Sequence, residues 1–241
     1  MGQSQDDADC KVYKGVSEES LQGLGFVILQ AVSFPGKKVV IPGLDPGIFN
    51  GELMKYNQKV LLKNGKEALL RNGDKADAKE VFEVFNQTHA ETDYLLSYPD
   101  ENSYDPEQEA QFLSDKTSSP DEIEIVAIVD EKIAGTAGIE AVGKKFKLKH
   151  RAELGISILK EYWGLGLGKA LINACIKCAE DAGYEQLELN VVSENERAIA
   201  LYKSFGFVEF GRNPKGFNSR TAGFQELVYM LLDLKKIEAK K

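Results

Sequence analysis

The chain has 241 residues, of which 43% are hydrophobic and 28% are charged, a composition typical of a folded globular protein. Its formal net charge of -8 argues against a broad nucleic-acid-binding surface, because such a surface needs clustered lysine and arginine side chains. The longest early apolar run, residues 24–34, is too short to cross a bilayer, and acidic residues precede it where a secretory signal carries basic ones.

The first 53 residues differ from the rest of the chain in how closely their turn-forming dipeptides are spaced. Three Pro-Gly dipeptides mark turns there, at residues 35–36, 42–43 and 46–47. The apolar segments 26–33 and 39–41 are predicted to form a small hairpin. We therefore interpret residues 1–53 as an N-terminal extension of unknown role, and residues 54–241 as one complete domain.

The domain begins with a predicted hairpin whose strands, 60–62 and 67–71, are joined across Asn64-Gly65. Asp74 is expected to cap a helix whose apolar positions are 78, 81, 82 and 85. A second helix is predicted over residues 106–113.

The middle of the domain is predicted to contain three strands, followed by one helical crossover connection to a parallel strand. Strands are predicted over 123–129 and 133–142, joined by the turn 130–132, and a third over 152–159. A glycine-rich loop, a helix over 168–182 and a strand over 186–192 follow, and they make a parallel β-α-β unit with the strand before them.

The last elements are a helix over 195–205, a strand from 206 and a final strand over 224–234. The fold class predicted from this order is α/β (α+β), with a mixed, largely antiparallel sheet and helices on both faces. Residues 212–224 are read as a basic loop before the last strand.

The glycine-rich loop runs from Tyr162 to Lys169 and has glycines at 164, 166 and 168. Glycine lets the backbone approach a ligand closely, and a helix start offers unpaired N–H groups and a partial positive charge. This combination suits a diphosphate. The spacing fits neither the P-loop nor the dinucleotide-binding pattern, so on its own the loop leaves the ligand open.

A second segment follows the strand 186–192 and reads Asn195-x-x-Ala198-x-x-Leu201-Tyr202-x-x-x-Gly206-Phe207. Together with Gly166-x-Gly168, this segment resembles the GNAT superfamily of acyl-CoA-dependent N-acyltransferases. The family's cofactor loop is [QR]-x-x-G-x-[GA], and Trp163 stands where glutamine or arginine is usual. The similarity covers about residues 67–234.

The resemblance implies a GNAT-type fold with acetyl-CoA as co-substrate and no metal. It implies that backbone groups of Ile158, Leu159 and Lys160 meet the pantetheine arm like an added strand. Asn195 is a favoured helix N-cap and, by resemblance, touches the same arm. The cofactor-binding residues implied are Ile158, Leu159, Lys160, Trp163, Gly164, Leu165, Gly166, Leu167, Gly168, Lys169, Asn195, Ala198 and Tyr202. The Trp163 indole is expected to pack over the loop.

The implied reaction is direct attack of a primary amine on the thioester, which needs a base for the ammonium and an acid for the departing thiolate. Glu153 lies on the polar face of its strand with Gly155 and Ser157, and by resemblance it is the base. Pairing of Glu153 with Arg151 is the alternative, and Glu188 and Glu140 are the reserve bases. By resemblance, Tyr202 is the general acid. The alternative interpretation is that its ring only packs in the core.

The acceptor is expected to be a small amine or a peptide N-terminus, with residues 212–224 either bordering its site or forming a solvated loop. A homodimer is compatible with the sequence. Cys175 and Cys178 recur at helical spacing and are read as core residues, and three cysteines without a disulfide framework favour the cytoplasm. The alternative function is a CoA-binding sensor without catalysis.

Overall fold

The computed structural model describes residues 53–235; the hairpin predicted within residues 26–41 and Cys10 lie outside them. The strands are β1 (Asn57–Leu61), β2 (Glu67–Asn72), β3 (Ile123–Val129), β4 (Lys132–Ala141), β5 (Arg151–Ile158), β6 (Gln186–Val192), β7 (Val208–Ser219) and β8 (Gly223–Asp233). The α-helices are α1 (Ala78–Glu91), α2 (Pro106–Thr117), α3 (Leu167–Asp181) and α4 (Glu196–Ser204), with short 3-10 turns η2 (Pro99–Glu101) and η3 (Lys160–Tyr162).

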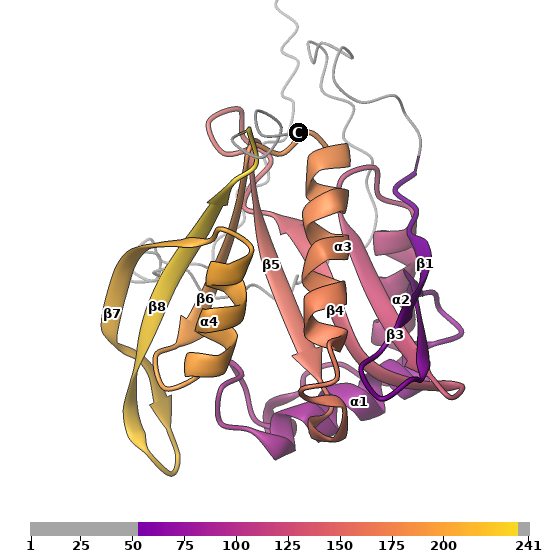
Figure 1. Ribbon diagram of the computed structural model, residues 1–241, viewed down its shortest axis with the longest axis horizontal. Helices are drawn as coiled ribbons and strands as arrows, with labels where there is room; N and C mark the ends of the chain where they lie inside the picture. Colours follow the sequence, from indigo (N-terminus) through magenta and orange to yellow (C-terminus); the bar gives the residue numbers. More distant parts are fainter. Residues whose placement is uncertain (1–52, 236–241) are drawn as a thin grey trace, which may run out of the picture. The chain divides into compact units, whose positions relative to one another are not determined.

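The strands form one sheet in the order β1-β2-β3-β4-β5-β6-β8-β7 (Figure 1). Within the described residues, β5 and β6 are the parallel neighbours, and every other neighbouring pair is antiparallel. The helix α3 connects β5 to β6. The predicted mixed sheet with a central β-α-β unit is therefore confirmed.

Helices cover the two faces of this sheet. The apolar sides of α3 and α4 pack in one core cluster with residues of β2 to β6 and β8, while α1 and α2 form a second cluster on the opposite face with Val126 and Ile133 (Figure 1). Cys175 and Cys178 are buried and unpaired in the first cluster, as their spacing predicted. Burial raises the pKa of both thiols, which suits a packing role.

The cap predicted at Asp74 closes the turn that leads into α1, and not the first turn of α1 itself. The Asp74 carboxylate accepts a hydrogen bond from the Ala76 N–H at 2.7 Å in the turn before α1, whereas Asp77 occupies the N-cap position. The Asp77 carboxylate accepts from the Asp74 N–H at 2.9 Å and is also held by both terminal nitrogens of Arg71, at 2.6 and 2.8 Å. The second helix also continues one turn beyond the predicted end, to Thr117.

The basic loop predicted over residues 212–224 is wrong, because most of it is strand. β7 runs to Ser219 and pairs with β8 in a long hairpin at the edge of the sheet. The Arg212 guanidinium pairs with Glu209 and Glu226, and Arg220 pairs with Asp100 and Glu101. None of the helices within residues 53–235 is long and apolar enough to cross a bilayer.

Candidate active site

The two parallel strands β5 and β6 pair for only three residues and then separate. The register joins residues 151–153 to residues 186–188, whereas β5 continues to Ile158 with only β4 as its partner (Figure 1). One edge of β5 is therefore open over residues 154–158. An open strand edge carries unpaired N–H and C=O groups that an extended ligand can use.

The backbone directions show which groups point to this open edge. The Arg151 carbonyl and the Leu159 N–H both bond toward β4, to Val142 and Ala134. Because backbone groups alternate in direction along a strand, those of Leu154, Ile156 and Ile158 point the other way. The Lys160 N–H is bound to the Glu91 carboxylate at 2.6 Å. Of the three residues expected to contact the pantetheine arm, Ile158 is the one on the open edge.

Trp163 reaches back to this edge instead of packing over the glycine loop. Its indole N–H donates to the Ile158 carbonyl at 2.7 Å. The side chain is 36% exposed and lines the cavity described below. The expectation that the indole covers the loop is therefore wrong.

The glycine loop presents a run of free backbone donors. Gly164 and Gly166 have φ values of +83° and +97°, which glycine alone adopts without strain, and α3 begins directly after Gly166. The six N–H groups from Gly164 to Lys169 donate to no acceptor within residues 53–235. Unpaired amides at a helix start, with the positive end of its dipole, can hold an anion such as a diphosphate.

The start of α4 stands beside this loop. A Cβ atom placed on Gly164 would lie 3.0 Å from a terminal nitrogen of Arg197, so the guanidinium lies against the loop. The Asn195 side chain caps α4 by accepting from the Ala198 N–H at 3.2 Å, as predicted. Arg197 belongs to the quoted motif segment but to none of its fixed positions, and no sequence signal marked it.

Three glutamates lie side by side across the sheet on the face of α1 and α2. The register places Glu140 of β4 beside Glu153 of β5, and Glu153 beside Glu188 of β6. Each of the two outer carboxylates has a cationic partner. Glu140 bonds to Lys116 at 2.8 Å, and Glu188 forms a two-pronged pair with Arg151.

Glu153, in the middle of this row, has no salt bridge within residues 53–235 and accepts a hydrogen bond from the Asn190 amide at 3.1 Å. The alternative that Arg151 pairs with Glu153 is not what the structure shows. Burial raises the pKa of Glu153, and the neighbouring charges of Glu188 and Glu140 raise it further. A carboxylate of raised pKa is a competent general base near neutral pH.

Tyr202 lies on α4 and is 7% exposed, with its ring packed against Phe207 at a centroid distance of 5.8 Å. Burial raises the pKa of the phenol, so the hydroxyl stays protonated at neutral pH. The hydroxyl makes no hydrogen bond within the described part of the chain. Tyr202 thus combines core packing with an available proton, and the two interpretations of this residue are compatible.

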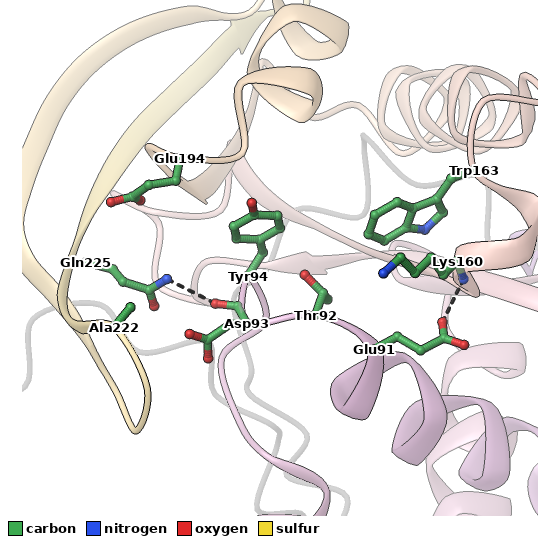
Figure 2. A pocket seen from close by; sticks show the side chains of 9 residues that line it. All are labelled: Glu91, Thr92, Asp93, Tyr94, Lys160, Trp163, Glu194, Ala222 and Gln225. Atoms are coloured by element: carbon green, nitrogen blue, oxygen red, sulfur yellow. Dashed lines mark hydrogen bonds between the residues drawn. The ribbon is translucent and has the colours of Figure 1, made fainter.

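A cavity of about 470 Å³ adjoins the open end of β5. Figure 2 shows Trp163 and Lys160 on one side of it, Gln225 and Ala222 on the other, and Tyr94 between them. The residues that line the cavity are Glu91, Thr92, Asp93, Tyr94, Lys160, Trp163, Glu194, Ala222 and Gln225. Residues 91–94 were missed by the sequence analysis, because the end of a helix and the turn after it carry no motif.

The far wall of the cavity is fixed by a set of contacts around Asp93, which we call the Asp93 clasp. One carboxylate oxygen of Asp93 accepts from the Ser219 hydroxyl at 2.5 Å and from Thr221 at 3.2 Å, and the other accepts from Tyr98 at 2.8 Å. The Gln225 amide donates to the Asp93 carbonyl at 3.2 Å. The clasp therefore ties the turn after α1 to the β7–β8 hairpin.

Within the described ranges, no three or more histidine, cysteine, aspartate or glutamate side chains are placed so that they could hold a metal ion together. The residues expected to bind the cofactor gather where β5 leaves β6, around the start of α3 and the start of α4. Glu153, the candidate base, lies on the face of the sheet that α1 and α2 cover. Tyr202 lies on the other face, in the core cluster of α3 and α4.

Comparison with known proteins gives the family. The sequence model of the acetyltransferase (GNAT) family matches residues 83–207, a little more than half of the chain. A human protein, N-acetyltransferase 8B, is 33% identical over 89 residues, which is 36% of this chain and 39% of that protein. The chain thus spans well under two thirds of this curated relative.

Solved structures extend the likeness to the whole fold. A GNAT-family acetyltransferase from Streptococcus pneumoniae superposes with a TM-score of 0.66 at 30% identity, covering 69% of this chain and 99% of that one. An acetyltransferase from Salmonella typhimurium, solved with its cofactor acetyl-CoA, shares the fold with a TM-score of 0.61 at 20% identity, covering 68% and 92%. The chain therefore belongs to the GNAT family of acetyltransferases.

Proposed function

We propose that this chain transfers the acetyl group of acetyl-CoA directly to a primary amine, either a small metabolite or a peptide N-terminus. The observation that carries the proposal is the open edge of β5 next to six unpaired amides at the start of α3. A diphosphate fits the amides, and an extended arm fits the strand edge. Coenzyme A contains both groups, joined in that order.

In this proposal, different residues of the chain bind different parts of the cofactor. The N–H groups of residues 164–169 and the Arg197 guanidinium hold the diphosphate, because all of them present positive charge to one place. The backbone of Ile156 and Ile158 holds the arm. The bound thioester supplies the activated acetyl group, and Asn195 orients the arm from the start of α4.

Glu153 is the proposed base. The amine arrives protonated at neutral pH, and a free carboxylate must remove a proton directly or through water before the nitrogen can attack. Of the three glutamates in the row, Glu153 is the one that no lysine or arginine neutralises within the described residues. Its raised pKa makes it a stronger base than an exposed glutamate.

Tyr202 is the proposed acid, because its buried phenol is protonated at neutral pH and can donate its proton to the sulfur as the thiolate departs. The cavity that adjoins Ile158 is the proposed acceptor site. Glu91, Asp93 and Glu194 on its lining favour a cationic acceptor, since an ammonium group is attracted by carboxylates.

The test has two measurements on the full chain. Calorimetry with CoA and acetyl-CoA measures cofactor binding, and thiol release from acetyl-CoA is followed against polyamines, amino acids, aminoglycosides and short peptides. Acetyl-CoA without amine corrects for hydrolysis. We expect saturable binding and thiol release with at least one amine class. Binding without release across the panel would favour the sensor alternative, and no heat with either ligand would remove the proposal.

A further inference from the structure

Trp163 is the single tryptophan of the chain, and it occupies a specific place on the open edge of β5. Its indole N–H donates to the Ile158 carbonyl at 2.7 Å, and that carbonyl is one of the groups that point away from β4. The ring therefore approaches Ile158 from the side on which β6 has already separated from β5.

An extended ligand that adds to a strand edge uses the same groups. Strand addition pairs the ligand's amides with edge carbonyls and N–H groups that point out of the sheet. At the end of β5 the outward carbonyl is that of Ile158, because the Leu159 N–H points back to Ala134 and the Lys160 N–H is bound by Glu91. The Trp163 indole, bound to this carbonyl, therefore occupies the position that an added strand would take.

We propose that Trp163 and the pantetheine arm compete for the Ile158 carbonyl, so that the indole leaves this edge when the arm binds. This inference rests on the proposed function, since it needs coenzyme A at the open edge. Trp163 acts here as a residue that sets cofactor affinity, and it takes no part in the chemistry. The side chain can move, because it is 36% exposed and faces the cavity.

The single tryptophan makes the displacement directly measurable. The emission of Trp163 is recorded in the wild-type chain during titration with CoA and, separately, with adenosine 3′,5′-bisphosphate, which lacks the pantetheine arm. We expect CoA to change the emission maximum and the intensity with the same saturation as the calorimetric signal. The bisphosphate should leave the emission unchanged, because it does not reach Ile158.

A variant provides the second measurement. Trp163→Phe keeps an aromatic ring but removes the N–H donor, so no hydrogen bond has to be broken before the arm binds. The expected gain in CoA affinity is about fivefold, the effect of one neutral hydrogen bond. The affinity for adenosine 3′,5′-bisphosphate should not change. Phe146→Leu, at an aromatic side chain that is 81% exposed, is the matched control and should bind CoA like the wild type.

The outcomes separate the two proposals. CoA binding by calorimetry with unchanged tryptophan emission, or with Trp163→Phe binding CoA no more tightly than the wild type, overturns the competition and leaves the proposed function standing. Circular dichroism of the variant shows whether it is folded, and the emission titration needs no variant. No CoA binding at all overturns both.

Discussion

Replacing Glu153 by glutamine is the most direct test of its proposed role as the general base. The change removes the one carboxylate of the three that has no cationic partner within residues 53–235 and keeps the side chain's shape. A general base contributes about 10²- to 10⁴-fold to a rate. Glu153→Gln should therefore lower kcat by that factor, which corresponds to about 3–5 kcal/mol of activation free energy.

The same row of three glutamates supplies the control. Glu188→Gln leaves the base in place but removes the partner of Arg151, whose side chain is only 21% exposed. Loss of this partly buried charge pair should cost about 1–3 kcal/mol of unfolding free energy. Glu153→Gln, in contrast, removes a carboxylate whose raised pKa already shows that its charge is poorly solvated, so stability should not fall. The two variants separate loss of chemistry from loss of stability.

The assay is thiol release with the best amine of the panel, measured across pH, together with thermal unfolding of each variant. In the wild type the rate should fall as the pH falls through the raised pKa of Glu153, because the protonated carboxyl cannot accept a proton. This acid limb should be absent in Glu153→Gln. If that variant kept wild-type kcat and the same pH profile, Glu153 would not be the base.

Three further predictions concern other parts of the domain. Tyr202→Phe should lower kcat while calorimetry finds the affinity for CoA unchanged, since the ring still packs against Phe207; equal kcat would exclude the general-acid role. Arg197→Ala should weaken acetyl-CoA but not S-acetylpantetheine, which has no diphosphate, and equal losses for both would argue against the contact at Gly164. Burial raises the pKa of Glu124 to about 8 from 4.5, so the folded state holds a proton that the unfolded chain releases, and stability should decline as the pH rises from about 4.5 to 8; thermal unfolding of Glu124→Gln should show a shallower decline than the wild type, since the raised pKa values of Glu109 and Glu153 still contribute.

Most of the fold could be predicted because its inner strands alternate and its turns carry clear signals. The strand 123–129 and the strand 186–192 have the predicted bounds, and Asp130 and Glu131 form the turn with positive φ that joins β3 to β4. A strand from residue 206 was predicted, but the second half of β7 was read as a loop, because an edge strand exposes both faces and therefore shows no alternation of polar and apolar residues. The misplaced cap at Asp74 reflects two aspartates three residues apart, either of which fits the pattern.

The site was predictable only in part, since motifs identify residue types but not their partners. Sequence left Glu140, Glu153 and Glu188 as candidate bases. Only the packing of α2 on the sheet assigns Lys116 to Glu140, and only the pairing of β5 with β6 assigns Arg151 to Glu188. The direction of the Trp163 indole depends on where β5 and β6 separate, which no local pattern encodes. Asn195 caps α4 as predicted, and Tyr202 lies two turns further along the same short helix.

The Asp93 clasp bears on any attempt to redesign which amine this domain accepts. It connects two segments that are more than a hundred residues apart in the chain. Exchanging one segment with that of a homologue would therefore leave Asp93 or Ser219 without its hydrogen-bonding partner. A productive chimera has to transplant residues 91–101 and 217–225 as a matched set. Libraries that diversify the two segments independently should yield mostly inactive clones, even when each half works in its own parent.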